Sequence, residues 1–116
     1  MIEKWINDVR SSAKPDDLGM ILIHNGIVRG TSKDGKKVRG IHLSYDKEKL
    51  NSLITEFSKN KGILAIKVWI NEGTLNIGDD IMYVLIAGRF RNDVLATFEE
   101  LLSKIKREIV SEREFF

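Results

Sequence analysis

Two strongly apolar segments and the helical pattern that follows them constrain the fold most. Residues 63–70 (ILAIKVWI) alternate between an apolar and a mixed face, and residues 81–88 (IMYVLIAG) are hydrophobic almost throughout. Both patterns are typical of buried strands. From residue 91 the period changes, and an apolar stripe at helical spacing runs to Ile109. We therefore predict an α+β fold with a mixed or antiparallel sheet packed by a long C-terminal helix, through Leu95, Phe98, Leu102 and Ile105, above Val68 and Val84.

The first half of the chain predicts two further helices and two further strands. Apolar residues at helical spacing indicate a short helix at about residues 2–11, before the SSAKPDD breaker. A strand is expected over residues 20–28, and the turn at Asp34-Gly35 predicts that it forms an antiparallel hairpin with a strand at residues 38–43. Helical spacing then returns, with Asp46 as a capping residue and Gly62 at the end.

The predicted order is helix, two strands, helix, two strands, helix. Residues 73–78 supply turn glycines between the last two strands, and residues 110–116 are expected to be a C-terminal tail. A chain of 116 residues with 42% hydrophobic residues is long enough for one core and too short for two. We predict a single domain over residues 1–116.

Composition excludes several classes of function. The chain has no cysteine, which rules out disulfides, iron–sulfur ligation and thiol catalysis and suits a reducing compartment. The two histidines, His24 and His42, lack metal-ligand spacing, so we expect no metal site and partly exposed strand histidines with ordinary hydrogen bonds. No apolar run is long enough to span a bilayer, so a cytoplasmic protein without a membrane partner or bound cofactor is expected.

Cationic side chains remain as candidates for function. Arg91 stands at the start of the last predicted helix, where unpaired N–H groups and the helix dipole favour an anion, although it could instead pair with Asp93. Lys106 lies at the edge of the apolar stripe, where partial desolvation would suit acid or base chemistry, although such a lysine often extends to solvent. Arg29 opens a basic segment that ends at Arg39. The three cations predict a site for an anionic ligand.

Two segments carry motifs in a characteristic order. The segment GMILIHNGIVRGTSKDGKKVRGIHLSY has a strand, a Gly-x-Val-Arg step, a polar turn and a second strand ending in tyrosine. The segment EGTLNIGDDIMYVLIAG has a Gly-x-Leu-x-x-Gly-Asp turn and a following strand, before an aromatic-Arg pair that opens a long helix. In these motifs the chain resembles the large, catalytic subunit of molybdopterin synthase, the MoaE family. The likeness extends from about Leu18 to near the end of the chain and implies an α/β-hammerhead-like fold.

The resemblance also implies roles for individual residues. It assigns Arg29 and Arg91 to substrate binding and Lys106, late in the last helix, to the active site. The chain departs from the family where Phe90 replaces a histidine and Arg113 replaces a second lysine. Arginine keeps its charge near neutral pH, so Arg113 is expected to bind substrate without transferring protons.

The resemblance implies sulfur transfer in molybdenum or tungsten cofactor biosynthesis. The sulfur would come from the C-terminal thiocarboxylate of a small ubiquitin-like, MoaD-like partner, the acceptor would be cyclic pyranopterin monophosphate, and the large subunit would be a homodimer. Because of the substitutions at Phe90 and Arg113, a non-catalytic relative that keeps the fold, dimer and anion pocket is an alternative. A small RNA-binding domain built on the hairpin at residues 29–39 is a more remote one, since no aromatic platform accompanies the basic residues.

Overall fold

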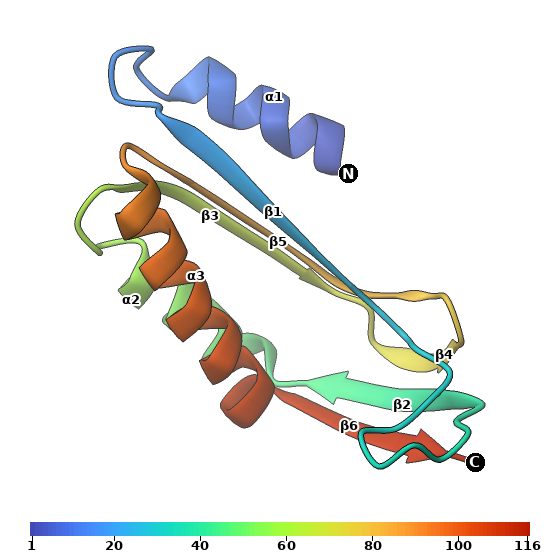
Figure 1. The fold of residues 1–116 in the computed structure, drawn as a ribbon. Helices are drawn as coiled ribbons and strands as arrows, with labels where there is room; N and C mark the ends of the chain where they lie inside the picture. Colours follow the sequence, from blue (N-terminus) through green and yellow to red (C-terminus); the bar gives the residue numbers. More distant parts are fainter.

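The computed structural model describes all 116 residues as an α+β fold with two antiparallel sheets and a long C-terminal helix (Figure 1). The larger sheet has the strand order β1-β5-β3, and the smaller sheet has the order β4-β2-β6. None of the helices is long and apolar enough to cross a membrane. In chain order the elements are α1 (Ile2–Ser12), β1 (Met20–Ile27), β2 (Gly40–Tyr45), α2 (Lys47–Phe57), β3 (Ile63–Ile70), β4 (Gly73–Asn76), β5 (Asp80–Gly88), α3 (Arg91–Lys104), the π-helix η1 (Ile105–Ile109) and β6 (Val110–Phe115).

The larger sheet lies between two helical layers, because both faces of its central strand are apolar. On β5, Val84 and Ile86 belong to the main core beneath α2 and α3, whereas Leu85 and Ala87 pack with α1 on the opposite face. All four side chains are fully buried. Figure 1 shows α1 on one side of the sheet and the other two helices on the opposite side. This alternation follows from the two-residue period of a strand.

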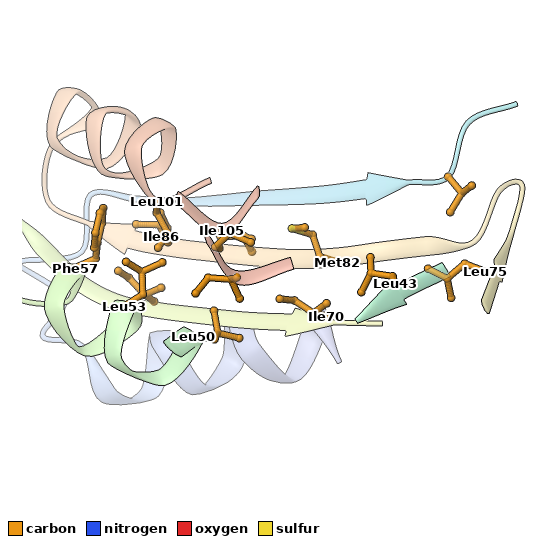
Figure 2. Close-up of a cluster of buried hydrophobic side chains, with 14 of the residues drawn as sticks. Leu43, Leu50, Leu53, Phe57, Ile70, Leu75, Met82, Ile86, Leu101 and Ile105 are labelled. Carbon is orange, nitrogen blue, oxygen red and sulfur yellow. The ribbon is translucent and has the colours of Figure 1, made fainter. Parts of the chain in front are cut away.

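One continuous core joins the larger sheet to the smaller one. Figure 2 shows side chains of α2, α3 and η1 on the larger sheet at one end, and Leu43 of β2 and Leu75 of β4 at the other. Each fully buried aliphatic side chain of this size contributes about 1.5–3 kcal/mol. The small sheet is therefore held against the end of the large one by apolar packing, and residues of both sheets line the cavity that is described below.

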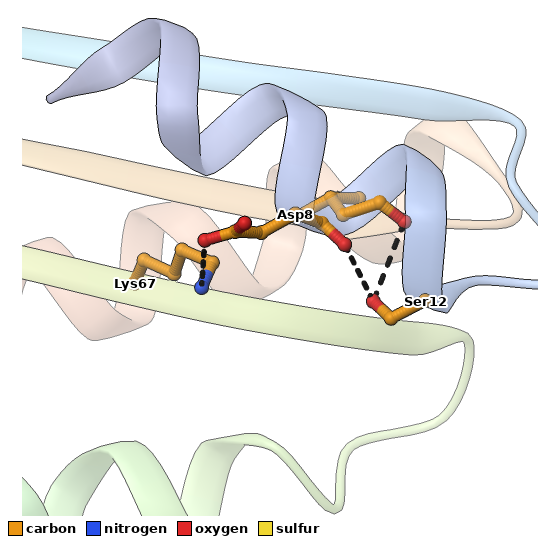
Figure 3. Close-up of polar contacts among 4 residues, drawn as sticks. Asp8, Ser12 and Lys67 are labelled. Carbon is orange, nitrogen blue, oxygen red and sulfur yellow. Dashed lines mark hydrogen bonds and ion pairs between the residues drawn. The ribbon is translucent and has the colours of Figure 1, made fainter.

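Helix α1 is attached mainly by its apolar face. Val9 is buried, and Trp5 and Ile6 pack around it against β5. The polar contacts are weaker: Lys67 of β3 lies 3.9 Å from the Asp8 carboxylate, and the Ser12 hydroxyl donates to the Asp8 carbonyl at 2.8 Å (Figure 3). Since both charged groups are partly exposed, this ion pair adds little to stability.

The predicted hairpin of the first two strands is wrong. The Asp34-Gly35 turn does form, with Gly35 at a φ of 84° and a bridge between Thr31 and Lys37. However, β1 pairs with β5 and β2 pairs with β4 and β6. The chain leaves the larger sheet after β1, and the apolar side of β2 is then buried at the junction of the two sheets.

Two strands lie where no strand was expected. Part of the predicted turn at residues 73–78 forms β4, and the predicted C-terminal tail forms β6, which pairs with the whole length of β2. Both strands are short and largely exposed, so neither has the apolar alternation that would identify it. Only their pairing with β2 makes them strands.

The helix predictions are right in kind and differ in detail. Asp46 caps α2 by accepting a hydrogen bond from the Lys49 N–H at 3.0 Å, as expected. The helix ends at Phe57, earlier than predicted, and Gly62 instead lies in the turn before β3 with a φ of 77°.

The last helix packs on the sheet through three of the four predicted residues: Ile105 is fully buried, and Phe98 and Leu102 pack against the core as partly buried side chains. Val94, Leu101 and Ile105 are fully buried and lie along one line of the helix, whereas Leu95 is 39% exposed. Thr97 shares the buried face because its hydroxyl accepts a hydrogen bond from the Asn60 side chain at 3.1 Å. The most deeply buried line of the helix therefore lies to one side of the predicted stripe, and Leu95 falls outside it. The prediction for Leu95 is therefore wrong.

Candidate functional site

A cavity of about 510 Å³ opens where the end of β1, the segment after it, η1 and β6 meet. Its charged and titratable lining comes from three separate parts of the chain. These residues are His24, Arg29, Lys33, Lys106, Glu112 and Glu114. Apolar side chains at the junction of the two sheets, such as Ile41 and Met82, complete the wall. Two of the predicted functional cations, Arg29 and Lys106, thus share one cavity although 77 positions (106 − 29) separate them in the sequence.

Arg29 is placed by the residue before it. The backbone N–H of Val28 donates to the Asp79 carbonyl at 2.9 Å, and the Val28 carbonyl accepts from the Gly78 N–H at 2.8 Å. Val28 is also buried. The backbone is consequently fixed immediately before Arg29, and the exposed guanidinium extends from an anchored position.

Lys106 is placed by the π-helix η1. Ile105 and Ile109 of this segment are buried in the core, which leaves Lys106 exposed on the side that lines the cavity. The π-turn ends when the Val110 N–H donates to the Ile105 carbonyl, after which the chain becomes β6. Single π-turns of this kind are rare and occur often at functional sites.

His24 is a cavity residue that the sequence prediction treated as an ordinary strand histidine. It lies on the face of β1 that is directed toward α3, and its ring centroid is 5.5 Å from that of Phe98. Burial lowers the pKa of His24 below its usual 6.5, and the positive charge of Lys106 lowers it further. Gly26, two residues along on the same face, keeps space open beside the imidazole. The one sequence signal for an open site beside this histidine is the glycine two positions after it, because residues two apart in a strand share a face.

The cations of the cavity have no acidic partner within the chain. The only two ion pairs in the structure join Asp8 to Lys67 and Asp17 to Arg89. Glu112 and Glu114 line the same cavity without approaching a cation to within 4.0 Å. The positive groups are therefore available to an anionic ligand. Their charge is needed because the two glutamates of the same cavity repel an anion.

Arg91 lies outside this cavity. It opens α3 as expected and is exposed, but the helix rises about 1.5 Å per residue, which places it roughly 20 Å from Lys106 along the helix axis. The alternative pairing with Asp93 does not form. Within one chain, Arg91 and Arg29 do not form one binding site.

Arg113 also lies outside the cavity, on the opposite face of β6. Alternation along the strand directs Glu112 and Glu114 into the cavity, and Arg113 lines a separate hollow of about 430 Å³. This second hollow includes Ser111 and His42, whose Nδ1 is 2.9 Å from the Thr74 hydroxyl. Arg113 and Lys106 therefore do not act together within one chain.

Comparison with known proteins agrees with the arrangement of strands and helices. Residues 2–108 match the family described as MoaE protein. The chain belongs to the MoaE family. An uncharacterized protein of Methanocaldococcus jannaschii is 31% identical over 93 residues, which cover 77% of this chain and 78% of the relative.

Solved structures share the fold of this MoaE family member at low sequence identity. Molybdopterin synthase from Staphylococcus aureus superimposes with a TM-score of 0.80 and 19% identity, covering 100% of this chain and 85% of that one. The molybdopterin biosynthesis MoaE protein from Burkholderia ambifaria gives 0.75 and 18%, with coverages of 98% and 78%. A complex of subunits 1 and 2 of molybdopterin-converting factor from Helicobacter pylori gives 0.72 and 16%, with coverages of 97% and 77%.

The lowered pKa of His24 predicts how this family member responds to acid. Because the pKa of His24 is lower in the folded state, the unfolded chain binds a proton at this residue more readily than the folded protein does. The stability present above the unfolded pKa of 6.5 is therefore lost as the pH falls from 6.5 through the folded pKa. The free energy of unfolding should therefore decrease over this range, and the decrease should be small because His24 is only partly buried. Chemical denaturation at several pH values should show a smaller decrease for His24→Gln. The control His42→Gln, in the other sheet, should retain the wild-type decrease.

Proposed function

We propose that this protein acts in molybdopterin biosynthesis as the large subunit of a synthase that transfers sulfur to cyclic pyranopterin monophosphate. Membership of the MoaE family supports the general role. The observation that carries the specific proposal is the cavity in which Arg29, Lys33 and Lys106 have no acidic partner within ion-pair distance. The sulfur donor would be the C-terminal thiocarboxylate of a small partner protein.

The chemistry explains why such a cavity needs unpaired cations. The substrate carries a phosphate and the donor carries a thiocarboxylate, so the reaction must bring two anions together. Arg29 is suited to the phosphate, because a guanidinium binds phosphate oxygens through paired hydrogen bonds. Lys106 lies across the cavity and can stabilise the oxyanion that develops at the acyl carbon of the donor.

The proposed partner is a small MoaD-like subunit. The Helicobacter pylori structure is a complex of two subunits of a molybdopterin-converting factor, and this chain shares the fold found there. We also propose a homodimer, which exposed apolar side chains at one end of the molecule support: Ile27 is 53% exposed and Ile77 is 46% exposed. Substrate-binding roles for Arg91 and Arg113 would then require a second copy, since both lie outside the cavity of their own chain.

A non-catalytic relative remains the second candidate. Phe90 and Arg113 stand where the resemblance implies a histidine and a lysine, and neither side chain transfers protons near neutral pH. Such a protein would keep the anion-binding cavity and bind the same ligands without converting them.

Incubation of the purified protein with cyclic pyranopterin monophosphate and a thiocarboxylated small partner tests the proposal. We expect formation of the dithiolene product together with conversion of the partner's terminus to a carboxylate. Ligand and partner binding without product would contradict the catalytic proposal and favour the non-catalytic relative. Absence of both binding events would contradict both candidates.

A further inference from the structure

His24 lines the cavity without any hydrogen bond to its imidazole. The imidazole is partly buried between β1 and Phe98 of α3, and it lines the cavity together with Lys106 and Arg29. It has no hydrogen-bond partner among the side chains and backbone groups of the chain, in contrast to His42, which contacts the Thr74 hydroxyl. An imidazole without a partner beside a cationic cavity is free to gain or lose a proton when a ligand enters.

We propose that His24 is the proton acceptor of this cavity, so that a dianion of the phosphate class binds together with a proton on the imidazole. This inference rests on the proposed anion site and adds to that site the positive charge of a protonated His24. A ligand of this class, such as the phosphate monoester formed when the cyclic phosphate opens, carries two negative charges, and the imidazolium would add one positive charge to those of Arg29 and Lys106. Binding of the dianion would thereby become stronger as the pH falls.

The charges around His24 give the direction of the effect. The ammonium of Lys106 on η1 disfavours the imidazolium, and Arg29 and Lys33 add positive charge from the segment after β1. Glu112 and Glu114 of β6 contribute negative charge from the opposite wall. The Asp80 carboxylate accepts hydrogen bonds from Tyr83 and Asn25, whose side chains lie on the other face of the sheet according to the strand register. Its negative charge is therefore directed away from His24. A bound dianion offsets the cations, and the cost of charging His24 then decreases.

The imidazole can accept a proton when the cyclic phosphate opens. Attack of water breaks one P–O bond of the ring and converts the diester, which carries one negative charge, into an alcohol and a phosphate monoester. The monoester becomes a dianion when it releases a proton, which the His24 imidazole accepts, and the resulting imidazolium then lies beside the dianion. Water is the only co-reactant of this step.

Sulfate is the appropriate probe because it remains a dianion across the range in which histidine titrates. The ring-proton signals of His24 and His42 would be followed by NMR from about pH 5 to about pH 8, with sulfate or with chloride at matched ionic strength. We expect sulfate to raise the pKa of His24 by about one unit, which corresponds to roughly tenfold tighter sulfate binding at the acidic end. The His42 signal is the internal reference for general screening.

Variants separate the inference from the proposed function. Lys106→Ala should raise the pKa of His24 in the free protein, whereas Lys104→Ala should leave it unchanged, because the Lys104 ammonium lies over the Phe57 ring at 5.5 Å and outside the cavity. In His24→Gln, sulfate affinity should lose its dependence on pH. Sulfate binding at the cavity without a change at His24, or with an equal change at His42, would overturn the inference and leave the anion site in place. A complete absence of sulfate binding would overturn both.

Discussion

Replacing Lys106 with alanine is expected to lower the rate of sulfur transfer by about 10² to 10³, the range for loss of one group that stabilises a developing oxyanion. Lys106 lines the cavity beside His24 and has no acidic partner, so its charge is available to the reacting atoms. If it acts mainly in the transition state, kcat should fall and the affinity for the pterin phosphate should change little. Single-turnover rates and equilibrium binding of the same samples would separate the two effects.

Lys104→Ala is the matched control, since it removes the same charge from the preceding turn outside the cavity. Its sulfur-transfer rate should remain within about twofold of wild type, and both variants should keep wild-type stability within about 0.5 kcal/mol, as is usual for surface substitutions. Equal losses in the two variants would show that overall charge matters and that Lys106 has no specific role.

Leu101→Ala is expected to lower the free energy of unfolding by about 2–5 kcal/mol, the usual cost of truncating a buried leucine. Leu101 is fully buried between α3 and the larger sheet, where it belongs to the core cluster in Figure 2. Removal of its side chain leaves a space that rigid strands on one side and α2 on the other cannot close.

Leu95→Ala provides the comparison on the same helix. Because Leu95 is 39% exposed, its truncation should cost less than about 1 kcal/mol. Chemical denaturation of both variants at neutral pH would measure the difference. Similar losses at the two positions would mean that the packing face of α3 is broader than the buried residues indicate.

Local sequence patterns predicted the helices and strands that bury an apolar face. They missed the strands that are stabilised only by backbone pairing with another strand. The helical spacing at residues 2–11 and the alternation at residues 63–70 each correspond to an observed element, α1 and β3. Strand β6 has three glutamate and arginine residues in a row, Glu112, Arg113 and Glu114, and no hydrophobic alternation predicts it. It is a strand because β2 offers unpaired backbone groups along its length, and such a long-range partner is invisible in a local pattern.

The candidate site was predictable in its residue types and only partly in its arrangement. Charge and position selected Arg29 and Lys106, and the fold brings them to one cavity. The same reasoning grouped Arg91 with them, and the family resemblance added Arg113. The length of α3 places Arg91 outside the cavity, and the two-residue alternation of β6 places Arg113 on the other face of the strand. His24 was missed because its meaning depends on Lys106 and Phe98, which are neighbours only after folding.

The number of residues in the π-turn at Ile105–Ile109 determines which side chains of β6 face the cavity, and hence the charge that a ligand meets there. Loss of one residue there would convert the turn toward an ordinary helix and advance β6 by one position, so that every side chain of the strand changes face. The cavity would then exchange two carboxylates, Glu112 and Glu114, for the single guanidinium of Arg113. Homologues that differ by a single insertion or deletion at this point would thus differ in the sign of charge on one wall, without any substitution in the cavity itself.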